Sequence, residues 1–256
     1  MPELITSRDN ALLKVVRKLA QDSQSYKKLG QIWIEGDHLC RAALNRGLTP
    51  AIGIYAESIW PGLSPDIQHA AKRTVLVPDR LFKELSGLES PAQFGFVLER
   101  PVHQAISPEA RTIVLDRVQD AGNVGSILRS AAAFDFQQVV AIQGTAALWS
   151  PKVLRAGMGA HFALKLIEGQ TEADLDALTV PLISTSSHTG NFMNKQVVPN
   201  PCAWVFGHEG QGVSAALLKR AMITVKIRQP GGEESLNVAA AAAICLFVSS
   251  VDSGPL

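Results

Sequence analysis

Cysteine is scarce in this chain, and the few cysteines present exclude two common kinds of site. Only Cys40, Cys202 and Cys245 occur among the 256 residues, and they lie far apart. An odd number without close pairs forms neither a disulfide framework nor the ligand spacing of a structural zinc site. We therefore expect no metal centre and a reducing compartment, which favours the cytoplasm.

Long apolar runs are missing as well. The chain begins Met-Pro-Glu-Leu-Ile-Thr-Ser-Arg, without the apolar stretch of a signal peptide. The longest apolar run, Val238 to Val248, is shorter than the roughly 20 residues that a membrane-spanning helix needs. Because 46% of the residues are hydrophobic and 18% are charged, we expect a buried core and no membrane partner.

The glycine fingerprints of common nucleotide-binding enzymes are also absent. No G-x-G-x-x-G and no Walker A sequence occurs, since Gly122-Asn-Val-Gly125 provides only G-x-x-G. These absences count strongly against an ATPase and against a nucleotide-dependent oxidoreductase. The oxidoreductase stays open as the weakest alternative, and binding of a nicotinamide dinucleotide would reveal it.

Charge is nearly balanced, with a net charge of +1. A balanced total neither favours nor excludes nucleic acid, because a local patch is enough to bind phosphates. Residues 1–30 carry six lysines and arginines against three acids. Such a stretch is either a solvated helix face or a phosphate-binding surface, and the charge pattern leaves both open.

Residues 1–100 are predicted to form a small α/β domain. One helix is expected to begin at Ser7 and another to cover Leu39–Leu44. Two prolines and little periodicity mark residues 101–110 as a linker. Short apolar runs between turns predict strands at 32–34, 51–55, 74–77 and 94–98.

Residues 111–256 follow a different pattern, in which apolar strands alternate with helices. Strands are expected at 112–115, 138–142, 163–167, 181–184, 203–206 and 223–227. Helices are expected at 122–134, 152–156, 172–178, 213–220 and 236–251. This alternation is typical of a parallel sheet covered on both faces, whose ligands bind where carboxyl ends of strands lead into helices.

The first polar segment at such a position is Asn123-Val-Gly-Ser-Ile-Leu-Arg129. Gly122 and Gly125 allow tight backbone turns, and Asn123 is a good helix cap. Arg129 stands among small and apolar residues, so it should face a site or a partner, because an unpaired buried charge is costly. The structural alternative is a plain cap and an ordinary ion pair.

The second segment, Phe206-Gly-His-Glu-Gly-Gln-Gly212, follows the strand expected at 203–206. Its glycines leave backbone groups accessible to a ligand, and Glu209 could accept hydrogen bonds or anchor an arginine. A tight turn with a helix-starting acid is the structural alternative. We do not expect His208 to be a general base, because no serine or cysteine nucleophile accompanies it.

The third segment, Ser235-Leu-Asn-Val238, follows a Pro-Gly-Gly turn. Ser235 is expected to cap the following helix, with Asn237 in the first turn. Polar side chains there can meet a ligand at the helix N-terminus, although such a pattern alone is more often structural than functional.

In this order the three segments resemble motifs 1, 2 and 3 of the SpoU (TrmH) branch of the SPOUT methyltransferases. Ser150–Phe162 is similar to the middle segment of that family. Ser7–Asn10 and Ile34–Gly36 are similar to the substrate-binding domain that precedes the catalytic domain in many members. The resemblance therefore covers nearly the whole chain.

The resemblance implies methyl transfer from S-adenosylmethionine to a ribose 2′-hydroxyl of RNA. It implies a knotted parallel-sheet domain at 111–256, with a C-terminal trefoil knot, after a ribosomal-protein-like α/β RNA-binding domain at 1–100. It also implies a homodimer with the active site at or near the subunit interface. Carried over by motif, the catalytic residues are Asn123, Arg129, Glu209, Ser235 and Asn237, and the cofactor-binding residues are Gly207, Ile227 and Leu236.

Two positions depart from the family pattern. Many members have Pro-Met after the isoleucine of motif 3, where this chain has Arg228 and Gln229. This change leaves the detail of the cofactor pocket open and adds a candidate phosphate contact. Pro91-Ala-Gln-Phe-Gly95 stretches a common Pro-Gln-Gly pattern and loosens the alignment of the domain boundary.

Members with such an N-terminal domain often act on large-subunit ribosomal RNA, which we favour over transfer RNA. A knotted RNA-binding or ribosome-assembly factor without enzymatic activity is the alternative, and the complete set of five catalytic candidates argues against it. Because a guanidinium is normally always protonated, Arg129 is expected to hold the phosphate beside the target ribose or to accept the proton once that phosphate is bound. The residues expected to bind RNA are Lys14, Arg17, Lys18, Lys27, Lys28 and Arg155.

Overall fold

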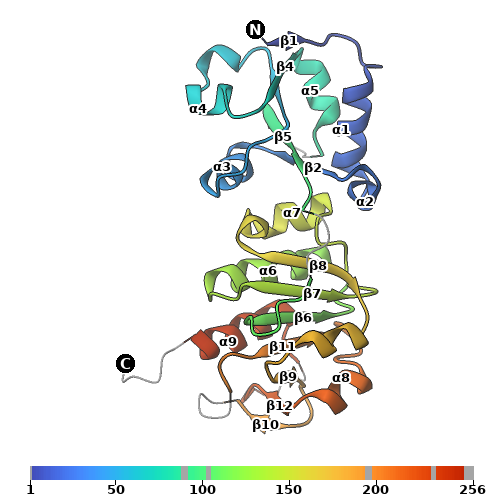
Figure 1. Ribbon diagram of the computed structural model, residues 1–256, viewed down its shortest axis with the longest axis vertical. Helices are drawn as coiled ribbons and strands as arrows, with labels where there is room; N and C mark the ends of the chain where they lie inside the picture. The colour runs from blue at the N-terminus through green and yellow to red at the C-terminus, as the bar shows by residue number, and fades with distance from the viewer. Residues whose placement is uncertain (1, 88–91, 102–104, 194–197, 232–234, 251–256) are drawn as a thin grey trace. The chain divides into compact units, whose positions relative to one another are not determined.

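The computed structural model describes residues 2–87, 92–101, 105–193, 198–231 and 235–250. The chain folds as two compact units (Figure 1). Unit 1 comprises Met1–Val102 and Trp149–Phe162, and unit 2 comprises His103–Leu148 and Ala163–Leu256. The division after Val102 falls inside the stretch predicted as a linker.

Unit 1 is built on a five-stranded sheet in the order β1-β4-β3-β5-β2. Strands β1, β4 and β3 are parallel, whereas β5 runs antiparallel to both β3 and β2. The elements of this unit are β1 (Glu3–Leu4), α1 (Ala11–Gln21), α2 (Ser25–Leu29), β2 (Gln31–Glu35), α3 (Asp37–Asn45), β3 (Ile52–Ala56), η1 (Trp60–Gly62), α4 (Pro65–Gln68), β4 (Arg73–Val77), α5 (Asp79–Leu85), β5 (Phe94–Glu99) and α7 (Pro151–Gly157).

Helix α7 belongs to unit 1 although it lies in the part of the sequence predicted as the second domain. It packs against β2 and α1. After the helix, the carbonyl oxygen of Met158 lies 3.3 Å from Nε2 of His38, and Gly159 lies against Ala42. Local spacing could not reveal this, because all of these contacts join residues more than a hundred positions apart.

Helix α1 shows how a polar residue sets the start of an element. Oδ1 of Asn10 accepts a hydrogen bond from the backbone N–H of Leu12 (2.9 Å), so the helix begins at Ala11 and the predicted start at Ser7 was wrong. Leu13, Val16 and Leu19 are buried on one side of the helix.

Unit 2 is built on a seven-stranded sheet in the order β10-β12-β9-β11-β6-β7-β8, and every neighbouring pair is parallel. The predicted parallel α/β sheet is therefore confirmed. Its elements are β6 (Thr112–Asp116), α6 (Ala121–Ala133), β7 (Gln138–Ile142), β8 (Lys165–Gln170), η3 (Ala173–Ala177), β9 (Leu182–Thr185), β10 (Asn191–Phe192), β11 (Ala203–Gly207), α8 (Ala215–Arg220), β12 (Ile223–Lys226) and α9 (Val238–Ser250), while η2 (Ala160–Ala163) spans the boundary of the two units.

The order of the strands reverses next to β6. The chain proceeds from β6 through β7 to β8 on one side, and β11, β9 and β12 lie on the other. A crevice opens at such a reversal, at the carboxyl ends of the strands, and ligands of α/β sheets bind there. Asp116 and Gly207, the last residues of β6 and β11, are paired at this point.

Three local predictions in unit 2 were wrong. Asp120 caps α6 by accepting from the backbone N–H of Asn123, so Asn123 lies inside the first turn. Gly122 and Gly125 lie in α6, as the helix predicted at 122–134 implies, and do not form the tight turn also expected of them. The helix predicted at 172–178 is a short 3₁₀ turn, η3, and the edge strand β10 was not foreseen, because two residues are too few for a periodic pattern.

The three thiols are buried, and we predict that they are unreactive in the folded chain. Burial raises the pKa of Cys202 and of Cys245 to about 12, and it raises the pKa of Cys40 well above its usual range. Because the thiolate is the reactive form, Ellman's reagent at pH 8 should modify none of them until the chain is denatured. A rapidly modified thiol in the native protein would contradict this packing.

The same pKa shifts predict how stability depends on pH. The folded thiol pKa lies above the unfolded value of roughly 8.5, so the neutral thiols favour the folded state. This contribution is fully present below about pH 8.5 and is lost as the pH rises toward the folded values. Denaturant unfolding at pH 7.5 and pH 10 measures the loss.

Candidate active site

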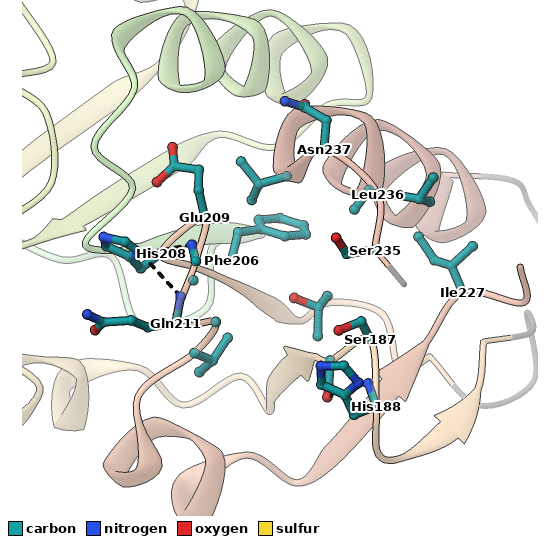
Figure 2. A pocket seen from close by; sticks show the side chains of 18 of the residues that line it. Ser187, His188, Phe206, His208, Glu209, Gln211, Ile227, Ser235, Leu236 and Asn237 are labelled. Atoms are coloured by element: carbon teal, nitrogen blue, oxygen red, sulfur yellow. Dashed lines mark hydrogen bonds between the residues drawn. The ribbon is translucent and has the colours of Figure 1, made fainter. Parts of the chain in front are cut away.

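A cavity of about 800 Å³ lies within unit 2 (Figure 2). Its walls come from the segments that follow β9, β11 and β12 and from the start of α9. This volume is typical of small-molecule sites. Apolar and polar side chains share the lining, which includes Thr185, Ser186, Ser187, His188, Thr189, Phe206, Gly207, Glu209, Gln211, Val225, Ile227, Gln229, Ser235, Leu236 and Asn237.

The loop after β11 is held closed by hydrogen bonds among its own residues. The backbone groups of His208 and Gly212 pair in both directions, at 3.1 and 2.8 Å. Nδ1 of His208 accepts from the backbone N–H groups of Gly210 (3.0 Å) and Gln211 (3.2 Å), as Figure 2 shows. The His208 ring therefore shapes the loop that lines the cavity.

Glu209 connects this loop to the first polar segment. Its carboxylate accepts from the backbone N–H groups of Gln119 (3.2 Å) and Asp120 (3.1 Å) and from Nδ2 of Asn123 (3.1 Å). Oδ1 of Asn123 in turn accepts from Nδ2 of Asn237 (2.9 Å). One continuous chain of hydrogen bonds thus joins all three polar segments at the wall of the cavity.

The hydrogen bonds to Glu209 also determine its ionisation. Partial burial raises its pKa, but the hydrogen bonds from Asn123 and from the backbone outweigh burial and lower the pKa below its usual value. The carboxylate is therefore charged at neutral pH. Since the folded pKa is the lower one, its contribution to stability is present above roughly pH 4.3 and is lost as the pH falls through the folded value.

Asn237 caps α9, a role that we had predicted for Ser235. Oδ1 of Asn237 accepts from the backbone N–H groups of Ala239 (2.9 Å) and Ala240 (3.2 Å), so the helix begins at Val238. Ser235 and Leu236 instead line the cavity before the helix starts. The predicted cofactor residues Gly207 and Ile227 line it as well.

Arg129 lies apart from the other catalytic candidates. Its side chain is exposed on α6, and within the described residues it makes no hydrogen bond or ion pair and does not line the cavity. No lysine or arginine occurs among the described residues of the lining. A single copy of the chain therefore presents no cationic side chain to this cavity from its described part.

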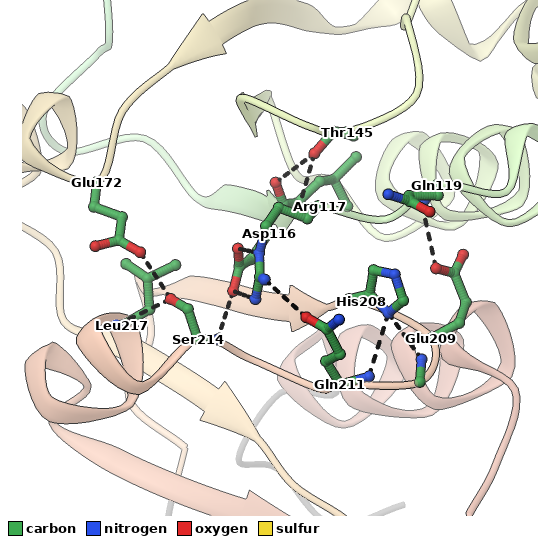
Figure 3. Close-up of polar contacts among 12 residues, drawn as sticks. Asp116, Arg117, Gln119, Thr145, Glu172, His208, Glu209, Gln211, Ser214 and Leu217 are labelled. Carbon is green, nitrogen blue, oxygen red and sulfur yellow. Dashed lines mark hydrogen bonds and ion pairs between the residues drawn. The ribbon is translucent and has the colours of Figure 1, made fainter.

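An ion pair between a buried aspartate and a half-buried arginine contacts the loop that lines the cavity (Figure 3). Asp116, fully buried at the end of β6, accepts from Nε of Arg117 (2.8 Å) and from the backbone N–H of Ser214 (2.6 Å). Nη1 of Arg117 donates to Oε1 of Gln211 (3.1 Å) in the loop that lines the cavity. Arg117 has a φ of 60°, and its backbone N–H donates to Oγ1 of Thr145 (3.1 Å).

Sequence reasoning missed two parts of this arrangement. The Asp116–Arg117 pair carried a signal, because it is charged and directly follows an apolar strand at the ligand-binding edge. The polar run from Thr185 to Thr189 carried the same signal at the end of the strand predicted at 181–184.

Replacing Arg117 by methionine should weaken binding of the predicted cofactor by about 10- to 150-fold, since a lost charge-assisted hydrogen bond costs about 1.5–3 kcal/mol. Calorimetric titration with S-adenosylmethionine measures the change. Gln211→Ala should have little further effect in the Arg117→Met background, because both substitutions break the same bond. Additive losses in this double-mutant cycle would contradict the role given to the Arg117–Gln211 contact.

The predicted RNA-binding residues all lie in unit 1. Lys18, Lys27 and Lys28 are exposed, whereas Lys14 pairs with Asp9 at 3.1 Å. Arg17 donates to the backbone carbonyl of Arg8, and Arg155 is half-buried on α7. Their role in RNA binding stays a prediction.

Comparison with known proteins assigns the family. The model of the SpoU rRNA Methylase family matches residues 110–247. This chain belongs to that family. The chain is also 30% identical over 247 residues to the 23S rRNA (guanosine(2553)-2′-O)-methyltransferase RlmP of Bacillus subtilis, and the match covers 95% of this chain and 97% of that one.

Solved structures show the same fold. A protein from Porphyromonas gingivalis assigned to the TrmH family of RNA methyltransferases is 27% identical, with a TM-score of 0.80 over 94% of this chain and 97% of that one. The SpoU methyltransferase AviRb from Streptomyces viridochromogenes, solved with AdoMet, is 21% identical, with a TM-score of 0.80 over 94% of this chain and 98% of that one.

The predicted family, enzyme class and S-adenosylmethionine cofactor of the SpoU methylase are thereby confirmed. The roles of individual residues stay predictions. Within the described ranges, no helix is long and apolar enough to cross a membrane. The same ranges contain no group of three or more His, Cys, Asp or Glu side chains that could hold a metal ion.

Proposed function

We propose that this SpoU methylase transfers a methyl group from S-adenosylmethionine to a ribose 2′-hydroxyl of large-subunit ribosomal RNA, with the cofactor in the cavity of unit 2. The observation that carries the proposal is the chain of hydrogen bonds from Asn237 through Asn123 to Glu209, which joins three separate segments at one wall of that cavity. A protein that only binds RNA does not need such a wall.

The residues present fit this cofactor. Ile227, Leu236 and Val225 offer an apolar surface to a flat adenine ring, and the loop from Gly207 to Gly212 offers backbone groups for polar contacts. When bound, S-adenosylmethionine supplies the electrophilic methyl group.

The remaining task for the protein is to position the ribose and to take up its proton, because a hydroxyl is a weak nucleophile. Hydrogen bonds fix the side chains of Glu209, Asn123 and Asn237 relative to one another. Ser235 lines the same cavity. Arg129 completes the site by holding the phosphate beside the target ribose, or by accepting the proton once that phosphate is bound.

We further propose that Arg129 is supplied by a second copy of the chain. Helices α6 and α9 pack against each other, and their outer face carries Phe134 and Phe247, with ring centroids 6.0 Å apart. Phe247 is 54% exposed and Ile244 38% exposed. A second copy that covers this apolar face would also cover α6, where Arg129 is exposed, and would give each cavity the cationic group that one copy does not present.

Three further features rest on the family resemblance. The proposed trefoil knot lies in the region of β11, β12 and α9, whose loops converge on the cavity. Unit 1 is proposed to be a ribosomal-protein-like domain that selects the RNA. A cytoplasmic location is proposed from the buried, unpaired cysteines.

The contribution of unit 1 is best tested by charge removal. Deleting residues 1–100 would also remove α1 and β2, against which α7 packs. A loss of RNA binding could then come either from missing contacts to RNA or from misfolding of α7. Replacing the exposed Lys18, Lys27 and Lys28 by glutamine should weaken RNA binding by roughly tenfold and leave cofactor binding unchanged. Unchanged RNA affinity would remove the assignment of these lysines.

The choice of RNA is tested by labelled methyl transfer to unmodified 23S rRNA and transfer RNA transcripts in parallel. Incorporation into 23S rRNA alone is the expected result, and incorporation into transfer RNA alone would overturn the substrate assignment. Tight cofactor binding without transfer to either transcript would contradict free 23S rRNA as the substrate. Failure of both transfer and cofactor binding would favour a non-catalytic RNA-binding protein.

A further inference from the structure

One exposed aromatic side chain in unit 2 contacts two basic ones. Phe192 belongs to the edge strand β10, which lies next to β12 (Figure 1). The register of the two strands pairs Phe192 with Lys226. Nζ of Lys226 lies 4.6 Å from the centre of the Phe192 ring, and Cζ of Arg228 lies 4.8 Å from it. We call these three residues the Phe192 surface.

Among the described residues, no carboxylate neutralises the charges of the Phe192 surface. Across the part of the chain that the structure describes, neither Lys226 nor Arg228 forms an ion pair with a carboxylate, whereas Arg117, Arg111 and Arg220 of the same unit each do. The ring is 48% exposed, and Arg228 is exposed. Both cations therefore remain available to a negatively charged partner.

The Phe192 surface adjoins the cavity through the chain itself. Val225, Ile227 and Gln229 line the cavity, whereas Lys226 and Arg228, which alternate with them, contact Phe192 instead. One short segment thus lines the cavity with some of its residues and presents two cations with the others. Lys226 and Arg228 are the basic residues next in the chain to those that line the cavity.

We propose that Lys226 and Arg228 bind backbone phosphates of the RNA strand next to the target nucleotide, and that Phe192 holds the two cations in position. The inference rests on the proposed function for the identity of the partner. RNA fits this surface because phosphates are the charges that Lys and Arg neutralise in nucleic-acid complexes. A strand that leaves a cavity also has its backbone exposed to such contacts.

The experiment measures binding of an unmodified 23S rRNA transcript at several salt concentrations. The variants are Lys226→Gln, Arg228→Gln, the double variant and Phe192→Leu, with Lys219→Gln as the control, because Lys219 is an exposed lysine of the same unit on α8. The double variant should raise the Kd by about tenfold. It should also reduce the slope of log Kd against log salt concentration by roughly 0.7 for each lost phosphate contact. Phe192→Leu should raise the Kd by a smaller factor, about threefold, because both charges remain.

Two readouts separate this proposal from a general defect. The affinity for S-adenosylmethionine should stay unchanged in every variant, and the KM for RNA should rise while kcat is retained. A wild-type Kd and salt slope in the double variant would overturn the inference, and continued methyl transfer would show that the proposed function still stands. An equal loss in Lys219→Gln, or a loss of cofactor binding in the double variant, would also overturn it. Wild-type binding of the RNA with weakened binding of acidic peptides or anionic vesicles would assign the surface to another partner and overturn the RNA assignment.

Discussion

Arg129→Ala is expected to lower the rate of methyl transfer by about 10²–10⁴-fold, the usual contribution of a group that moves a proton or stabilises charge in the transition state. The affinity for S-adenosylmethionine should stay within about twofold of wild type, because the proposed partner of Arg129 is the RNA phosphate or the ribose hydroxyl and not the cofactor. Single-turnover transfer and calorimetric titration measure the two quantities. An equal loss of cofactor binding would contradict both roles proposed for Arg129.

Mixed dimers test whether Arg129 acts in the cavity of the partner. Arg129→Ala is combined with Gly207→Ala, which damages the cavity but leaves Arg129 in place. If the arginine crosses the interface, the mixed dimer has one intact site, and random mixing restores about a quarter of wild-type activity. If Arg129 acts within its own chain, both sites of the mixed dimer lack one part and activity is not restored. Sedimentation of the wild-type chain as a monomer would contradict the dimer itself.

Gly207→Ala is expected to lower the affinity for the cofactor by at least about 100-fold. The added methyl group forces the loop after β11 away from the strand. A Cβ atom at Gly207 would overlap the backbone of Gly212 and Val213. Backbone cannot move aside like the end of a flexible side chain, so the wall that carries Glu209 is displaced. We also expect a lower thermal midpoint of unfolding.

Gly210→Ala is the matched control for this prediction. It adds the same methyl group to the same loop, but the nearest described atoms, in the His208 ring, lie 3.8 Å away, which is ordinary contact. Affinity and thermal midpoint should stay close to wild type. Equal affinities of the Gly207→Ala and Gly210→Ala variants would show that the packing of this loop is not what forms the site.

The sheet of unit 2 could be predicted from the sequence because its strands are continuous apolar runs. β6 and β11 are buried along their whole length, and such runs are distinctive. The helix starts could not be predicted to the residue. Asp120 and Asn123 are both good caps three positions apart, as are Ser235 and Asn237 two positions apart, and tertiary contacts decide between them.

The candidate site could be predicted in part. The family resemblance predicted Asn123, Glu209 and Asn237 as members of one site, and in the structure hydrogen bonds connect them. Arg129 lies apart from these residues, because six positions along α6 rotate its side chain roughly 120° away from Asn123. The pairing of Arg117 with Gln211 depends on the tertiary fold and leaves no periodic pattern in the sequence.

The chemical identity of the product tests most directly whether this protein methylates a ribose hydroxyl. Unmodified 23S rRNA is incubated with the protein and S-adenosylmethionine and digested to nucleosides, which are analysed by mass spectrometry. The account predicts one 2′-O-methylated nucleoside, with the methyl group on the sugar fragment. A methyl group on the base fragment, or no methylated nucleoside although the cofactor is bound, would contradict it.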